Sequence, residues 1–244
     1  MKKTLTFLML AFVLISNAQE STLLRLNYNK GDKYKMSIEV SQKMGAAGIM
    51  DMKMIMEMDI INVKDDTYDS KIKFTKIAMN SNAGGQEINF DSDMKDEELD
   101  DMGKMMKTQM APMLSAIISA KGNNLGEVTE MKVEPNVPGL NDIGNQLSNV
   151  TYPKEAIKVG STWEMEKESK GMKMKFVYTV KSISENEIIL DISGSILGLA
   201  EGDITGDMNI DKKTGVPMES NIAMKMSVQG QTIDSNISLL SEKI

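Results

Sequence analysis

The segment from Met50 to Ile60 alternates between apolar and polar residues, with Ile55 as the single exception. Every even-numbered position in it is apolar, and five of those six positions are methionine. Alternation with a period of two is typical of a β-strand with one buried and one solvated face. Because methionine is unbranched and polarizable, the side chains on the buried face of this strand are predicted to adjust their conformations to whatever packs against them. The segment Met172–Val180 largely repeats the pattern.

Two stretches of the chain begin in the same way. Gly31-Asp-Lys-Tyr34-Lys-Met36 and Gly160-Ser-Thr-Trp163-Glu-Met165 each place an aromatic residue three positions after a glycine and a methionine two positions later. Each stretch is followed by an alternating strand, a turn and a further strand. We interpret this common order as an internal duplication, with a first half at residues 19–137 and a second half at residues 151–244.

The first half contains a predicted helical insertion at about residues 92–111. Its acidic residues come early and its lysines late, which is the order that the helix dipole favours. Apolar residues recur in it at spacings of three and four, as on one face of a helix: Leu99, Met102, Met106 and Met110. Asp91, Ser92 or Asp93 is expected to cap the start, and Pro112 is expected to end the helix. A second, short helix is predicted at 138–150, between the halves.

The remaining pattern favours an antiparallel sheet. Strands recur about every 10 to 15 residues and are separated by turn signals, which is typical of a meander and not of alternating βαβ units. The turn Asp211-Lys-Lys-Thr-Gly215 is one example. We therefore expect a mainly β (α+β) fold: one large curved antiparallel sheet, or incomplete barrel, built from two related halves, with one or two helices against its concave face.

The N-terminus has the composition of a secretory leader. Lys2 and Lys3 precede the apolar run Leu5–Ile15, and Ser16-Asn17-Ala18 supplies the small residues of a cleavage site. The run is too short to span a bilayer as a helix, and no cysteine follows the cleavage point to carry a lipid. We expect a signal peptide at 1–18 and an exported, soluble protein, periplasmic or secreted, that is not lipid-anchored and has no transmembrane segment.

Charge and residue content exclude several classes of function. Without the leader the chain keeps 26 Lys and Arg against 35 Asp and Glu, a net charge of −9. This balance disfavours nucleic acid as a partner, because binding to phosphates requires clustered basic residues. The chain has no Cys and no His, and it carries no nucleophile motif, phosphate loop or EF-hand spacing. We expect no enzyme activity, no catalytic or metal-binding residues and no cofactor.

Methionines of the alternating strands form the candidate binding surface. A curved sheet faced with thioether side chains suits lipids and other apolar ligands. The candidate residues are Met52, Met54, Met56, Met58, Met172, Met174, Met224 and Met226. We expect a non-enzymatic exported protein whose Met-lined concave face binds a lipid or acyl chain. Two alternatives stay open: a thioether site for Cu(I) or Ag(I), because soft ligands select soft metals, and an envelope scaffold or interaction protein without a small ligand.

Three motifs occur in a recognisable layout: the leader end Asn17-Ala18-Gln19, the stretch Leu24–Tyr34 and the stretch Pro153–Trp163. In this layout the chain resembles an uncharacterised family of exported Gram-negative bacterial proteins, a domain of unknown function. The motifs are structural, because glycine permits a tight turn into a strand and the aromatic residue then anchors it. The resemblance covers nearly all of the chain after the leader. It implies no activity and no functional residue.

Overall fold

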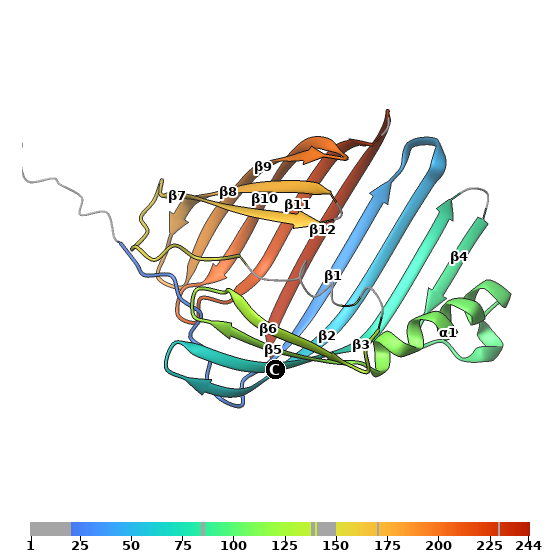
Figure 1. Ribbon diagram of the computed structural model, residues 1–244, viewed down its shortest axis with the longest axis horizontal. Helices are drawn as coiled ribbons and strands as arrows, with labels where there is room; N and C mark the ends of the chain where they lie inside the picture. The colour runs from blue at the N-terminus through green and yellow to red at the C-terminus, as the bar shows by residue number, and fades with distance from the viewer. Residues whose placement is uncertain (1–20, 84–85, 138–139, 141–149, 170, 229) are drawn as a thin grey trace, which may run out of the picture.

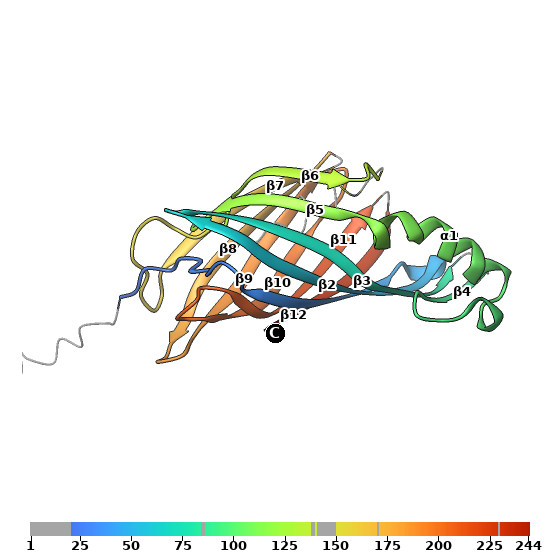
Figure 2. The ribbon, with the colours of Figure 1, turned by 90° about the horizontal axis from the view of Figure 1, so that it is seen from below.

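The computed structural model describes residues 21–83, 86–137, 140, 150–169, 171–228 and 230–244. The predicted leader at 1–18 and most of the predicted connecting helix at 138–150 lie outside these residues. The described chain forms one antiparallel sheet of 12 strands that curves strongly, with one α-helix at a corner (Figures 1 and 2). This confirms the predicted mainly β fold with an incomplete barrel.

Each half of the chain supplies six strands. Those of the first half are β1 (Lys33–Lys43), β2 (Gly48–Lys64), β3 (Thr67–Ala83), β4 (Gln86–Asp91), β5 (Ile117–Asn123) and β6 (Val128–Glu134). Those of the second half are β7 (Thr162–Ser169), β8 (Met172–Ile183), β9 (Glu187–Gly198), β10 (Glu201–Asp211), β11 (Pro217–Val228) and β12 (Gln231–Lys243).

The strand order explains why the sheet resembles an opened barrel. Across the sheet the strands run β6-β5-β3-β2-β1-β12-β11-β10-β9-β8-β7, and β4 pairs with β3 beside this path. The two halves therefore join where β1 pairs with β12. The outer strands β6 and β7 are consecutive strands of the chain, and in the described structure each pairs on one side only. The opening of the barrel lies between them.

The two similar stretches enter the sheet through matching hydrogen bonds. The N–H of Gly31 donates to the carbonyl of Ile60 at 2.8 Å, and the N–H of Gly160 donates to the carbonyl of Val180 at 2.8 Å. Both glycines have positive φ, at 91° and 84°, which glycine adopts without steric cost. These shared contacts agree with the duplication, which stays a prediction.

Glycines on the inward side of β9 and β10 permit the strong curvature. A Cβ atom at Gly194 would lie 2.1 Å from a carbonyl oxygen of the neighbouring strand, and at Gly202 or Gly206 it would lie 2.2 Å from one. These distances leave no room for a side chain. Glycine in a strand is typical of places where the sheet bends or another backbone comes close.

Two hydrophobic clusters fill most of the inside of the sheet. The closed-end core packs the segment before β1, including Leu24 and Tyr28, against Tyr152 and the inward residues of β8 to β10. The helix-side core lies between β1 to β5 and the helix, and includes Phe90 and Met106. The end of the sheet opposite the closed-end core is formed by the hairpins β1–β2, β7–β8, β9–β10 and β11–β12, and we call it the open end (Figure 1).

The helix α1 (Asp101–Ser115) begins later than the predicted range of 92–111. Capping by Asp91, Ser92 or Asp93 was the wrong expectation, because the carboxylate of Asp100 accepts the Gly103 N–H at 2.7 Å. The 3-10 helix η2 (Asp96–Glu98) occupies part of the predicted range. The expected end at Pro112 is also wrong, since the proline lies inside the last turn. There its missing N–H costs a single helical hydrogen bond.

Candidate functional site

The inward face of the sheet is only partly buried at the open end. Its apolar side chains there are half-buried and lie at the margins of the two cores. We call this set the open-end strip: Val40, Met52, Met172, Met174, Ile222, Met224, Met226 and Ile237. The strip joins the margins of the two cores across the middle of the sheet, and every residue in it is a flexible or β-branched apolar side chain.

The structure separates the eight predicted methionines into two groups. Met54 and Met56 are buried in the helix-side core, and Met58 is buried in the closed-end core. Met52 and the four methionines of the second half belong to the open-end strip. The reason is that β2 runs from the open end into the packed interior, so one alternating pattern supplies lining residues first and core residues later.

The register places Met174 and Met226 in one row across the second half, with the buried Ile196 and a glycine between them. Met174 lies opposite Ile196, Ile196 opposite Gly202, and Gly202 opposite Met226. A Cβ at Gly202 would lie 2.2 Å from the Lys225 carbonyl oxygen and 2.7 Å from the Met226 Cα, so β10 and β11 come close together at this point. Adjacent strands are about 4.8 Å apart, so the backbones of Met174 and Met226 are separated by about 14 Å.

This spacing gives no support to a thioether metal site. The methionines of β2 follow one another along a single strand, and two strands lie between β2 and β11. A Cu(I) or Ag(I) site would need several sulfurs around one point. Among the described residues there is also no group of three or more His, Cys, Asp or Glu that could hold a metal ion.

The strand β7 adds two inward residues that were absent from the predicted site. The Trp163 indole N–H donates to the carbonyl of Thr151 at 3.0 Å, and its ring stacks on Tyr178 with centroids 5.4 Å apart. Lys167 lies opposite Met174 at the same edge of the sheet. Burial lowers the pKa of Lys167 to about 8. The spacing of Trp163, Met165 and Lys167 at alternate positions was the sequence signal that could have identified both.

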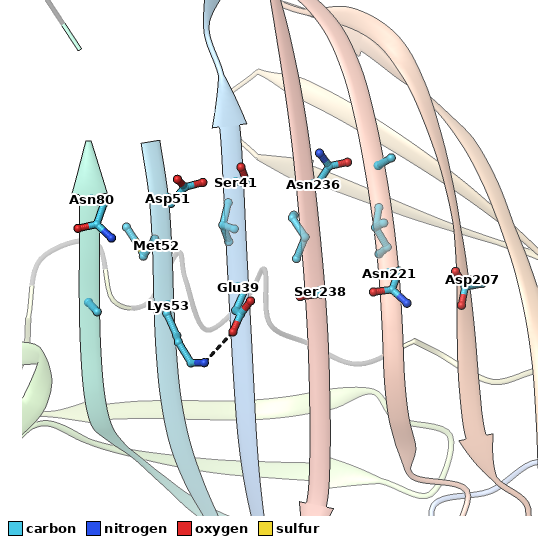
Figure 3. A pocket seen from close by; sticks show the side chains of 15 residues that line it. Glu39, Ser41, Asp51, Met52, Lys53, Asn80, Asp207, Asn221, Asn236 and Ser238 are labelled. Carbon is cyan, nitrogen blue, oxygen red and sulfur yellow. Dashed lines mark hydrogen bonds and ion pairs between the residues drawn. The ribbon is translucent and has the colours of Figure 1, made fainter. Parts of the chain in front are cut away.

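A hollow lies on the outward face, and most of the residues that line it are polar or charged. It has a volume of about 680 Å³ and extends over β3, β2, β1, β12, β11 and β10 (Figure 3). Side chains such as Asn80, Asn221 and Asn236 line it, and the Lys53 ammonium is 2.7 Å from the Glu39 carboxylate within it. Both members of this ion pair are exposed, so its contribution to stability is small.

Comparisons with known proteins identify the fold but no family. No family model matches the chain, and no curated protein matches it. A solved structure described as "lipid-protein interactions in lipovitellin" is similar over 88% of this chain, with a TM-score of 0.59 and 10% identity. This chain spans only 25% of the length of that one. The likeness places the protein in the class of large open antiparallel sheets.

Two further structures are more distant. Rv2717c from M. tuberculosis has a TM-score of 0.32 and 11% identity, with 88% of this chain and 91% of that chain covered. The S-type phycobiliprotein lyase CPES from Guillardia theta has a TM-score of 0.20 and 10% identity, with 86% and 88% covered. Neither is similar enough to inform the function.

The described part of the chain contains no helix with the length and apolar character needed to cross a membrane.

Proposed function

We propose that this protein is an exported, non-enzymatic binding protein whose open-end strip takes an apolar ligand such as a lipid or acyl chain. The observation that carries the proposal is the half-buried state of the strip. Eight apolar side chains lie together on the inward face at the open end, and each keeps part of its surface accessible. Apolar surface that a fold leaves open in a concave site is the usual setting for a hydrophobic ligand.

The chemistry of the strip suits a flexible ligand. Five of its residues are methionines, which change rotamer easily and have a polarizable sulfur. The likeness to lipovitellin supports the proposal at the level of fold, because the description of that structure names lipid–protein interactions.

The only tryptophan of the chain gives a direct assay. Trp163 lies on the inward face of β7 and stacks on Tyr178, so a brominated acyl chain bound along the strip would quench its fluorescence. The probe is the methyl ester of a brominated fatty acid, which carries no charge. We expect saturable quenching by the ester, and no quenching by a brominated sugar of similar size.

Two variants at adjacent positions of β11 locate the binding surface. Met226→Glu places a carboxylate on the open-end strip, whereas Ser227→Glu places one on the exposed outward face of the same strand. We expect Met226→Glu to weaken binding of the ester at least about tenfold, because a charge would have to be desolvated. Ser227→Glu should bind like the unmodified protein. Equal binding by both variants, or no saturable quenching at all, would overturn the proposal.

A further inference from the structure

The hollow on the outward face differs in composition from the surface around it. Cross-strand ion pairs are typical of that surface. One example toward the closed end is Lys35–Glu242, at 3.7 Å, and one at the edge of the sheet is Lys175–Glu164, at 2.9 Å. Of the residues that line the hollow and point outward, most instead carry an amide, a hydroxyl or a small side chain (Figure 3): Ser41, Asn80, Asn221, Ala223, Asn236 and Ser238. The volume of about 680 Å³ is within the range of ligand-binding clefts, about 300–1,000 Å³.

The register arranges polar side chains of the hollow in a row that crosses the strands. Asp51 lies opposite Asn80 on one side and Ser41 on the other, and Ser41 lies opposite Asn236. Because neighbouring strands are about 4.8 Å apart, the row offers one polar side chain per strand over about 14 Å. The sugar residues of an extended glycan follow one another at a similar spacing. Successive sugars can therefore each meet a polar group from a different strand.

The polar groups of the hollow have hydrogen-bonding capacity to spare. Among the described residues, the side chains of Asn80, Asn236 and Asp51 form no hydrogen bond or ion pair with another residue. The amide of Asn221 donates to the Glu219 carboxylate at 3.2 Å and keeps its carbonyl oxygen and its second N–H. An amide both donates and accepts hydrogen bonds, as a sugar hydroxyl does, and a carboxylate accepts them. The lining thus matches the hydrogen-bonding groups of a carbohydrate.

We propose that the hollow is a second binding site and that its ligand is an extended neutral glycan lying across the strands. Three carboxylates, those of Glu39, Asp51 and Asp207, line the hollow together with the ammonium of Lys53. This excess of negative charge disfavours an acidic glycan. The inference does not depend on the proposed function, because the side chains of the open-end strip point to the opposite face of the sheet. The competing explanation is an ordinary solvated face, which predicts no saturable binding.

Isothermal titration calorimetry with neutral and acidic oligosaccharides tests the inference. The neutral probes are cellopentaose, maltopentaose and penta-N-acetylchitopentaose, and the acidic probe is pentagalacturonic acid. We expect at least one neutral probe to bind saturably, with a dissociation constant in the millimolar range or below, and the acidic probe to bind at least about tenfold more weakly. The tightest neutral probe identifies the kind of sugar. Absence of saturable binding by all three neutral probes, or tighter binding of the acidic one, would overturn the inference.

Exchanges of exposed residues assign the binding to the hollow. Asn236→Ala and Asn221→Ala should each weaken binding of the neutral probe about three- to tenfold, through the loss of hydrogen bonds. Ser227→Ala, on the outward face of β11 but outside the lining, should bind like the unmodified protein. Met226→Glu should also leave glycan binding unchanged, because it alters the other face and the apolar ligand alone. Unchanged affinity in both asparagine variants, with folding verified by circular dichroism, would exclude the hollow as the site.

Discussion

Two buried tyrosines differ in whether their hydroxyl groups form hydrogen bonds, and this difference makes a sharp prediction. The side chain of Tyr152 is 3% exposed, and its hydroxyl donates to the carbonyl of Gly215 at 2.7 Å. The side chain of Tyr34 is 1% exposed, but within the described residues its hydroxyl has no hydrogen-bond partner. Burial, reinforced by the charge of Asp32, raises the pKa of Tyr34 to about 12, so both hydroxyls are neutral at ordinary pH.

Replacement of each tyrosine by phenylalanine removes one oxygen and changes the packing little. Tyr152→Phe leaves the Gly215 carbonyl buried without this bond, so we expect the free energy of unfolding to fall by about 1–2 kcal/mol. For a chain of this size, that loss corresponds to a melting temperature lower by roughly 2–8 °C. Tyr34→Phe removes a hydroxyl that is already desolvated without compensation. We expect no loss of stability there, or a gain of up to about 1 kcal/mol.

Urea unfolding followed by Trp163 fluorescence measures both changes. The slope of the unfolding free energy against urea should stay the same, so that a shift in the midpoint reports stability alone. The reasoning would be refuted if Tyr34→Phe lost as much stability as Tyr152→Phe. That result would mean that the Tyr34 hydroxyl forms a strong hydrogen bond in solution, with Asp32 or a buried water as its acceptor.

Three more predictions concern the curvature, an ion pair and the helix. Gly202→Ala should lower the unfolding free energy by about 1–3 kcal/mol in the same urea assay, because a Cβ has no room beside the next strand. Burial raises the pKa of Asp32, but hydrogen bonds from Lys243 and the Asn29 N–H outweigh burial and hold the pKa below its usual range. The resulting stability is present above about pH 4 and is lost as the pH falls through the lowered pKa. Asp32→Asn should therefore show a flatter fall in melting temperature between about pH 4 and pH 2 than the unmodified protein. Asp100→Ala should cost about 1 kcal/mol through loss of the helix cap, and Asp100→Asn should restore most of it, as circular dichroism during thermal unfolding would show.

The alternation at Met50–Ile60 and Met172–Val180 was enough to predict strands there and to predict which side of each strand is buried. It did not distinguish Met52 from Met54, since both occupy the same phase of β2 and only the position of the helix-side core makes one half-buried and the other buried. The start of α1 was missed for a similar reason. Several acidic residues between Asp91 and Asp101 can cap a helix, and the choice of Asp100 depends on how the preceding turn packs.

The candidate site was predicted in part. Sequence reasoning located the methionines of the second half that form the open-end strip, but it included three residues of the core. Sequence reasoning did not include Lys167. Its inward position on β7 follows from the alternation of residues that begins at Trp163. A charged residue at an apolar phase is easily interpreted as an exposed interruption of the pattern, and only the register with Met174 shows on which face it lies.

The pairing of β1 with β12 has a consequence for how the protein is made. The partners Lys35 and Glu242 come from opposite ends of the chain, and contacts between residues roughly 200 positions apart are slow to form. During synthesis, β1 appears early and must wait for the last strand before its free edge is covered. Throughout that interval it exposes unpaired backbone groups to any other strand nearby. The newly made chain should therefore depend on chaperones until β12 arrives, and truncation before residue 231 should yield aggregates and not a smaller folded sheet.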